Sequence, residues 1–269
     1  MIRMRAADGS DPASGPCPAV VITGGTRGIG AGLAAAFLLA GSEVLVCGRT
    51  APTDSASLPS VHGRTPLFCQ ADVRDPDQAR RVIRTAQAEF GRVDVVISNA
   101  GGSPEAAAAS ASPRFHQKII ELNLVAPLHV AQSANEVMQA QDGGGTIIMI
   151  GSVSGTRPSP GTAAYGAAKA GLHHLVTSLA IEWAPKVRLN CVAPGFVATE
   201  AASAHYGDSG RADAVARTVP LQRMATPADV ARACLFLASS EAGYISGATL
   251  LVHGGGEPPG FLAAARDPA

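Results

Sequence analysis

The sequence predicts an α/β fold, with helices on both faces of one doubly wound, mostly parallel sheet of about seven strands. Short β-branched runs alternate with longer alanine-rich helical segments along most of the 269 residues. The short runs are apolar at successive positions, which is typical of parallel strands covered by helices on both faces. Because no linker or repeat interrupts this pattern, we expect a single domain.

In the first half of the chain, four apolar runs indicate strands and two longer segments indicate helices. The strands are expected at residues 19–23, 43–47, 66–70 and 93–98, and the helices at 29–40 and 76–91. Asp75 and Pro76 mark the start of the second helix, because aspartate is favoured as an N-cap and proline at the first helical position. The polar segment 50–64 predicts a loop.

In the second half, a long helical stretch is expected from about Pro113 to Gln141, after the low-complexity segment 105–112, with a bend at Pro127. The remaining strands are expected at 146–152, 187–193 and 249–252, and the remaining helices at 163–184 and 227–238. Thr226 caps the last helix. Between residues 195 and 225 both signals fade, so we interpret this segment as a mobile loop over the active site.

The predicted domain spans residues 19–256. Residues 1–18 carry two arginines without an apolar run behind them, which indicates a flexible leader rather than a secretion signal. Residues 257–269 are expected to form a C-terminal tail. The least polar window, Ala31–Gly48, is interrupted by Gly41–Glu43 and predicts buried core rather than a membrane span. We expect a cytoplasmic protein that does not enter a membrane.

Charge and composition exclude several classes of partner. With 21 basic and 21 acidic residues, the chain has no surplus charge for nucleic acid or an anionic membrane. The five cysteines include no C-x-x-C pair, which suits reduced thiols. The seven histidines show no ligand spacing, so we expect no metal site.

The segment TGGTRGIG, residues 23–30, joins the first strand to the first helix. Its glycines let the backbone approach a pyrophosphate, and the open helix N-terminus attracts negative charge. Glycines also occur in ordinary turns, but the strand before and the helix after favour a Rossmann-type dinucleotide site.

The residue after the second strand distinguishes the two nicotinamide dinucleotides. A carboxylate there would bond the ribose 2′-hydroxyl of NAD, whereas this chain has Arg49. Arg27 in the glycine turn is expected on the same side, and two guanidinium groups can hold a 2′-phosphate. NADP(H) is therefore favoured over NAD(H); the alternative is that Arg49 is an ordinary solvated arginine.

Tyr165 and Lys169 lie four residues apart in the helix predicted at 163–184, so both side chains are expected on one face. A cation beside a phenol lowers the pKa of the phenol and makes it a usable proton donor and acceptor near neutral pH. The same spacing occurs by chance on surface helices, so the pair needs further residues to support this interpretation.

Several motifs follow one another in order along residues 19–256 and, with the glycine turn, resemble the short-chain dehydrogenase/reductase family. They are ADV (71–73), NAGG (99–102), ELNL (121–124), IGSVSG (150–155), YGAAK (165–169), NCVAPGFVAT (190–199) and PLQRMATPADVA (220–231). Within the family, the chain is similar to 3-oxoacyl-thioester (acyl-carrier-protein) reductases. The resemblance implies an oxidoreductase that transfers hydride between nicotinamide and a carbonyl or secondary alcohol. Together with the two arginines, it leads us to expect an NADP(H)-dependent enzyme that acts on a small or medium organic substrate.

The resemblance also implies four catalytic residues. Ser152 would hydrogen-bond the substrate carbonyl, and Tyr165 would give or take the proton. Lys169 would hold the nicotinamide ribose and lower the pKa of Tyr165, while Asn123 would keep a water in a proton path to Lys169. Taken singly, Ser152 could merely end its strand and Asn123 could merely bond a helix backbone, as such residues often do.

A larger set of residues is implied to line the cofactor. It comprises Gly24, Thr26, Arg27, Gly28, Ile29, Gly30, Arg49, Asp72, Val73, Asn99, Ala100, Gly101, Tyr165, Lys169, Pro194, Gly195, Val197 and Thr199. Asp72 would accept from the adenine amino group, and the residues from Pro194 onward would border the nicotinamide. Thr199 could instead cap a turn.

The substrate pocket is expected among the loops at 102–112, 153–161 and 196–223. Its candidate contacts are Phe196, His205 and Tyr206, although loop aromatics also pack as lids on the protein itself. The family implies a homotetramer or homodimer assembled through long helices such as 163–184. His253 stands where the family often has an aspartate, and we expect it to be a partly exposed, hydrogen-bonded histidine.

Two other functions stay open at this point. One is a redox sensor that binds NADP(H) without turnover, against which the four intact catalytic residues argue. The other is a dehydratase or epimerase on the same fold, which would form product without net consumption of the cofactor.

Overall fold

The strands form one sheet of seven, in which every neighbouring pair is parallel, in the order β3-β2-β1-β4-β5-β6-β7. The computed structural model describes residues 17–52, 58–200, 209–259 and 261. The strands are β1 (Ala19–Thr23), β2 (Glu43–Gly48), β3 (Leu67–Gln70), β4 (Val95–Ser98), β5 (Gly145–Ile150), β6 (Val187–Pro194) and β7 (Thr249–Val252). The predicted fold class is confirmed, and each strand lies close to its predicted bounds.

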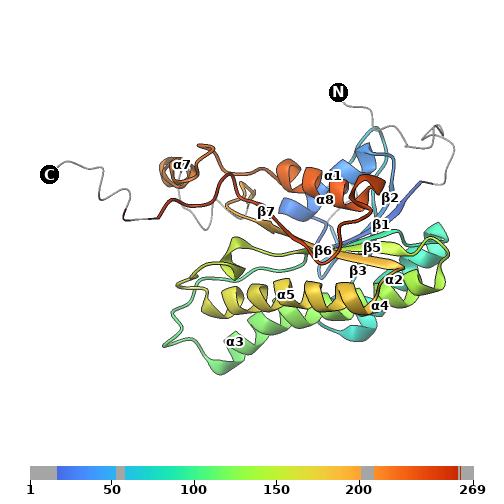
Figure 1. Ribbon diagram of the computed structural model, residues 1–269, viewed down its shortest axis with the longest axis horizontal. Coiled ribbons are helices and arrows are strands. Elements are labelled where there is room, and N and C mark those ends of the chain that lie inside the picture. The colour runs from blue at the N-terminus through green and yellow to red at the C-terminus, as the bar shows by residue number, and fades with distance from the viewer. Residues whose placement is uncertain (1–16, 53–57, 201–208, 260, 262–269) are drawn as a thin grey trace.

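Helices cover both faces of the sheet (Figure 1). On one face, α1 (Gly28–Leu39) packs against α8 (Pro227–Ala238). The other face carries α2 (Pro76–Phe90), α4 (Ala126–Ala140) and α5 (Ala163–Glu182). The core accordingly forms two clusters, and successive strand residues such as Val21 and Ile22 contribute to opposite clusters.

The strand order places a switch point between β1 and β4, because the chain proceeds from β1 towards β3 on one side and from β4 towards β7 on the other. In doubly wound sheets, ligands bind at this point, outside the carboxyl ends of the strands. β1 ends at Thr23, directly before the glycine turn, and β4 ends at Ser98, directly before Asn99. Two of the motifs found in the sequence therefore meet at the switch point.

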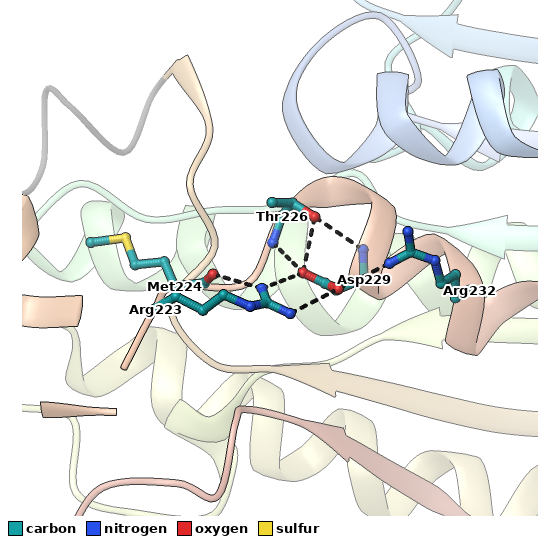
Figure 2. A network of polar contacts seen from close by, with 5 residues as sticks. All are labelled: Arg223, Met224, Thr226, Asp229 and Arg232. Carbon is teal, nitrogen blue, oxygen red and sulfur yellow. Dashed lines mark hydrogen bonds and ion pairs between the residues drawn. The ribbon is translucent and has the colours of Figure 1, made fainter. Parts of the chain in front are cut away.

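Side-chain caps begin two of the helices at the predicted residues. The Asp75 carboxylate accepts hydrogen bonds from backbone N–H groups in the first turn of α2, at 2.9 and 3.3 Å. At α8, Thr226 and Asp229 form a reciprocal capping box (Figure 2). The Asp229 carboxylate also pairs with Arg223 at 2.7 Å and Arg232 at 3.1 Å, so charge adds to the cap at the start of this helix.

The helical stretch that begins at Pro113 is interrupted one turn earlier than predicted. It consists of α3 (Pro113–Ile120), a π-helical turn η2 (Glu121–Val125) and α4. Pro127, where a bend was predicted, lies in the first turn of α4, directly after this π-helical turn. Single π-helical turns inside helices are frequent at functional sites, and this one contains the candidate residue Asn123.

The segment 195–225, predicted to be a loop, contains the ten-residue helix α7 (Ser209–Thr218). Its sequence, SGRADAVART, has few large apolar residues and so gives no clear helical periodicity. Figure 1 shows α7 at the end of the molecule where α5 begins. His205, Tyr206 and most of the predicted leader and tail lie outside the described residues. None of the described helices has the length and apolar character needed to cross a membrane.

Candidate active site

The glycine turn between β1 and α1 has a conformation that favours glycine. Gly24 and Gly28 have φ angles of +64° and +54°, which glycine adopts without strain. A Cβ atom on Gly30 would lie 2.1 Å from the Gly24 carbonyl oxygen, so no side chain can be accommodated there. α1 begins directly after Arg27, whose side chain makes no capping hydrogen bond. The first N–H groups of α1 therefore lie at the carboxyl edge of the sheet, where they can meet an anion.

Asn99, at the end of β4, holds this turn in place. Its Nδ2 donates to the carbonyl oxygens of Thr23 at 3.0 Å and Gly24 at 3.1 Å. The Thr23 hydroxyl in turn accepts the backbone N–H groups of Asn99 and Ala100, both at 3.0 Å. The Asn99 amide thus braces the glycine turn. Of the other predicted cofactor residues near the switch point, Val73 is buried, Arg27 is exposed, and Thr26, Ile29 and Ala100 are partly exposed.

A solvent-open hollow of about 420 Å³ lies beside the ends of β2 and β3. It is lined by Arg49, Gln70, Ala71, Asp72, Gln78 and Arg81. The hollow brings together two predicted cofactor residues, Arg49 and Asp72, and adds Arg81, which the sequence analysis missed. Arg81 comes from α2 and donates to the Gln70 carbonyl at 2.8 Å. No local motif marks it, because its place at the hollow depends on how α2 packs beside β3.

The Asp72 carboxylate in this hollow already has a cationic partner. Asp72 forms an ion pair with Arg74, whose Nε donates to Oδ1 at 3.0 Å. The hydrogen bond from Arg74 holds the pKa of Asp72 below its ordinary value, and the charge of Arg49 acts in the same direction. Asp72 is thus an ionised acceptor at neutral pH, and a ligand that bonds it must share it with Arg74.

Tyr165 and Lys169 lie one turn apart on α5, with the Lys169 Nζ 5.6 Å from the centre of the Tyr165 ring. Lys169 is only 3% exposed. Its Nζ donates to the Ile150 carbonyl at the end of β5, at 2.8 Å. A Cβ atom on Gly101 would lie 3.4 Å from the same Nζ. The ammonium is therefore enclosed by β5, α5 and the segment after β4, and does not face solvent.

The pKa shifts in this cluster differ from the sequence prediction. Burial lowers the pKa of Lys169 from 10.5 to about 8. Burial also raises the pKa of Tyr165, and the hydrogen bond with Ser152 opposes that rise only in part. The prediction that the pKa of Tyr165 lies below its ordinary value is therefore wrong. The physical reason is that burial disfavours the charged phenolate by more than the hydrogen bond with Ser152 favours it.

Asn123 is fully buried in the π-helical turn η2, and its side chain braces the segment after β4. Its Oδ1 accepts the Gly102 N–H at 2.9 Å, and its Nδ2 donates to the carbonyl oxygens of Gly102 and Ile119, both at 2.9 Å. A Cβ atom on Gly101 would lie 2.8 Å from Oδ1. Asn123 and Lys169 therefore converge on Gly101 from two different elements.

Ser152 follows β5 and begins the 3₁₀ turn η3 (Val153–Gly155). Its Oγ accepts the Ser154 N–H at 3.1 Å, and the same hydroxyl hydrogen-bonds Tyr165. Lys169 hydrogen-bonds Ile150, the last residue of β5, and Tyr165 hydrogen-bonds Ser152, two residues further on. Two hydrogen bonds therefore join α5 to the end of β5. The structure thus brings Ser152, Tyr165 and Lys169 together in one cluster.

The residues after β6 lie against the glycine turn. Pro194 ends the strand, and the Gly195 N–H donates to the end of β7 at 3.0 Å. A Cβ atom on Gly28 would lie 3.5 Å from the Thr199 Cγ2, although the two residues are far apart in the sequence. Val197 is buried and its backbone forms a parallel bridge with Ala225. The segment from Pro194 to Thr199 therefore lies beside the switch point, on the side of β6.

Phe196 lies near a charged residue that the sequence analysis did not single out. The Arg157 Cζ is 5.9 Å from the centre of the Phe196 ring, and Arg157 pairs with Glu257 at 2.7 Å. Arg157 therefore joins three segments: its own loop after Ser152, the loop after β6 that carries Phe196, and the segment after β7 that carries Glu257. Neither Arg157 nor Glu257 carries a signal in the sequence, since they become neighbours only through the fold.

The described residues suit a dinucleotide that runs along the carboxyl edge. Gly24, Gly28 and Gly30 leave bare backbone at the switch point, where a pyrophosphate needs close approach. The hollow with Arg49 lies on the β2–β3 side, and the enclosed Lys169 lies on the β5 side. An extended molecule with an anionic middle and a reactive end matches this layout.

Comparison with known proteins agrees with this layout. Residues 24–257 match the family described as enoyl-(acyl carrier protein) reductase. The 3-oxoacyl-[acyl-carrier-protein] reductase FabG of Escherichia coli is 36% identical over 236 residues, which cover 87% of this chain and 95% of FabG.

Two solved structures are similar over most of their length. Ligand-free aldohexose dehydrogenase AldT of Thermoplasma acidophilum has a TM-score of 0.80 and 29% identity, covering 94% of this chain and 96% of its own. ElxO with NADP bound has a TM-score of 0.81 and 31% identity, covering 89% of this chain and 98% of its own. The chain therefore belongs to the short-chain dehydrogenase/reductase family, whose members are oxidoreductases that use a nicotinamide cofactor on small-molecule substrates.

Proposed function

We propose that the protein is an NADP(H)-dependent oxidoreductase that interconverts a carbonyl and a secondary alcohol on a small or medium organic substrate. The observation that carries this proposal is the cluster of Ser152, Tyr165 and the enclosed Lys169 beside the glycine turn. Bound nicotinamide would supply or accept the hydride, and the residues of the chain would move the accompanying proton.

Tyr165 is the proton donor in the reducing direction. Its raised pKa keeps the hydroxyl protonated at neutral pH, which is the form that a general acid requires. Ser152, which shares a hydrogen bond with Tyr165, donates to the same substrate oxygen as negative charge develops there. In the oxidising direction the phenolate takes the proton from the alcohol.

Lys169 stabilises the phenolate that remains after proton transfer. Its pKa of about 8 leaves the ammonium charged at neutral pH, and its Nζ lies 5.6 Å from the Tyr165 ring centre. Asn123 approaches the same glycine as Lys169. The Asn123 amide itself is bonded to the backbone of Gly102 and Ile119, so the role in which Asn123 keeps a water in a proton path to Lys169 stays a prediction.

NADP(H) is the preferred cofactor in this proposal. Arg49 and Arg81 line the hollow at the ends of β2 and β3, and Arg27 is exposed in the glycine turn. Three guanidinium groups favour a 2′-phosphate, because each can form charge-assisted hydrogen bonds that a ribose hydroxyl leaves unused. ElxO, a related protein of known structure, contains NADP.

The substrate is bounded by the loops that meet at Phe196 and Arg157. The two relatives act on different carbonyl compounds according to their names, an acyl-carrier-protein thioester for FabG and an aldohexose for AldT. For this chain we therefore propose the reaction only. Assays with a panel of ketones, 3-oxoacyl thioesters and sugars would identify the substrate.

Assembly into a homodimer or homotetramer is also part of the proposal, and a cytoplasmic location stays a prediction. Ile181, on α5, is 82% exposed. Leu250 and Leu251, on the edge strand β7, are also exposed. Apolar residues on a long helix and on a sheet edge are the kind of surface that a second copy covers. Light scattering after gel filtration measures the assembly directly.

The reaction is tested by mixing the protein with NADPH and the substrate panel, and following loss of the nicotinamide absorbance. Turnover with at least one carbonyl compound is expected. Tyr165→Phe should lower kcat by about 100- to 10,000-fold, because general acid catalysis contributes that much. Tyr244→Phe is the matched control, since Tyr244 is fully exposed and should retain wild-type activity.

Binding of NADPH, measured by fluorescence, separates the competing functions. Tyr165→Phe should still bind NADPH, because the loss is expected in chemistry. Tight NADPH binding without turnover of any carbonyl compound by the wild type would instead indicate a sensor. Product formation without consumption of NADPH would indicate a dehydratase or epimerase.

A further inference from the structure

A third polar side chain extends the catalytic face of α5. Tyr165, Lys169 and His173 follow one another at intervals of four residues, so they lie on one face of the helix. The proposed reaction uses the first two. His173 is partly buried and points back towards the end of β5.

The ring of His173 contacts the backbone that carries Ser152. The Ser152 N–H donates to His173 Nε2 in a long hydrogen bond of 3.5 Å. A Cβ atom on Gly151 would lie 2.4 Å from Nε2, and one on Gly155 would lie 2.8 Å from Cε1. The loop from Gly151 to Gly155 is thus built closely around the imidazole, and any side chain at either glycine would displace the ring.

The charges around His173 favour the neutral ring. Burial lowers its pKa below the ordinary 6.5, and the neighbouring Lys169 ammonium lowers it further. From β6, Cys191 lies beside the same space, where a Gly151 Cβ would be 2.6 Å from its Sγ. Burial raises the pKa of the Cys191 thiol to about 11, so it contributes no charge at neutral pH. The loop between β5 and η3 contributes no titratable group.

We propose that His173 is a positioning residue for Ser152, whose neutral ring accepts the Ser152 N–H and thereby holds the serine hydroxyl against Tyr165. The proposal rests on the proposed function, in which Ser152 and Tyr165 share the substrate oxygen. Only a ring with its proton on Nδ1 can act in this way, because Nε2 must keep a lone pair.

Protonation of His173 reverses this contact. The protonated Nε2 presents an N–H to the N–H of Ser152, so two donors face each other. It also places a second positive charge beside Lys169. The Ser152 loop is expected to move away, and misplacement of a catalytic group by about 1 Å can cost about 100-fold in rate. Reduction should therefore decline as the pH falls below about 6.5.

The geometry can be tested without turnover, by nuclear magnetic resonance of protein labelled with ¹⁵N-histidine. Comparison with His173→Gln identifies the His173 signals. We expect the Nδ1–H tautomer, with an unprotonated Nε2, and a titration midpoint below 6.5. A proton on Nε2 in the neutral ring, or a midpoint above 6.5, overturns the proposal even if no substrate has been found.

The catalytic consequence is tested by pH profiles of kcat in three variants. In His173→Gln the decline below pH 6.5 should disappear, because glutamine offers an acceptor that does not titrate. His173→Leu, which offers none, should lower kcat about 10-fold at pH 7 while the NADPH dissociation constant changes less than 2-fold. His174→Gln is the matched control on the same helix; it is exposed and should keep the wild-type profile.

The outcomes distinguish this proposal from the proposed function. A wild-type kcat in His173→Leu, or an unchanged acid decline in His173→Gln, overturns the role of His173 while leaving the reaction intact. A wild type that reduces no carbonyl compound overturns the reaction, and the tautomer measurement then decides the role of His173 by itself.

Discussion

The two ends of the carboxyl edge use charge in opposite ways. At the β2–β3 end, Asp72 and Arg74 form a pair in which both side chains are 27% exposed, beside the exposed Arg49. At the β5 end, Lys169 is 3% exposed and its partner is a backbone carbonyl. The same sheet therefore presents a partly solvated, paired site at one end and a single enclosed cation at the other.

This difference follows from the cost of removing an ion from water. Exposed pairs keep their hydration, so they contribute little energy but bind anions in a manner that salt screens. An enclosed cation is destabilised by burial, which moves the pKa of Lys169 to about 8, within the range where enzymes work. We infer that the first end selects the cofactor and the second end performs the chemistry.

The largest expected effect is at the enclosed cation. Lys169→Met keeps the length of the side chain and removes its charge, so kcat for reduction should fall about 100- to 1,000-fold, the usual cost of losing one electrostatic group in a site. Lys118→Met, at an exposed lysine of α3, is the control and should leave kcat unchanged. Similar losses of kcat in Lys169→Met and Lys118→Met would show that the enclosed lysine has no special role.

The second prediction concerns pH. Lys169 is charged below its pKa of about 8 and neutral above it, so the charge is present at neutral pH and is lost as the pH rises. The value of kcat/KM for reduction, which reports the free enzyme, should fall above about pH 8. Tyr165 does not explain such a fall, because its pKa is raised. A profile that stays level up to pH 10 would contradict the assignment.

The third prediction concerns the exposed end. Arg49→Gln should weaken NADPH binding about 10-fold, the effect of losing one hydrogen bond to a charged group, and leave NADH binding unchanged. The difference should shrink in high salt, because Arg49 is exposed. Fluorescence titrations with both cofactors measure it, and Arg114→Gln on α3 serves as the control. If the binding of NADPH and of NADH were weakened equally, Arg49 would not bind the 2′-phosphate.

The smallest expected effect lies away from both ends, at the start of α8. Asp229→Asn removes the charge from the capping network of Figure 2 and should lower the free energy of unfolding by about 1 kcal/mol at pH 7. Chemical denaturation measures the change. Asp213→Asn on α7 is the control, since that aspartate is exposed and should have little effect.

The contribution of Asp229 to the free energy of unfolding depends on pH, and the sign follows from its pKa. Arg223 and the Thr226 N–H hold the pKa of Asp229 below its ordinary 3.8. A depressed pKa in the folded state stabilises the protein above the unfolded pKa, and this contribution is lost as the pH falls through the folded pKa. The difference between wild type and Asp229→Asn should therefore be constant above about pH 5 and shrink in acid. A difference that grows in acid would contradict the network.

Local patterns predicted most of the fold. Apolar runs marked the strands, and Asp75, Pro76 and Thr226 marked the helix starts, because capping is decided within one turn of the chain. The π-helical turn at 121–125 and helix α7 were missed. Neither has a clear apolar periodicity of its own, which is the signal that marks a helix in a sequence.

The candidate site shows the same division. Tyr165 and Lys169 could be paired from their spacing, and the glycine turn from its place between a strand and a helix. Arg81 and Arg157 could not be found in this way, because each acquires its neighbours from another segment. The spacing places His173 on the same face of α5, but its contact with the Ser152 loop depends on the fold. The direction of the Tyr165 pKa was predicted wrongly for the same reason, since burial is a property of the folded chain.

The sequence by itself determined the order of strands and helices, the glycine turn and the pair of residues on α5. These features depend on interactions between residues that are near each other along the chain. Only the tertiary structure decided which groups are dehydrated. It encloses the Lys169 ammonium, buries the Tyr165 phenol and leaves Arg49 in solvent. The energy of an ion depends on everything within several ångströms of it, and most of those atoms come from remote parts of the chain.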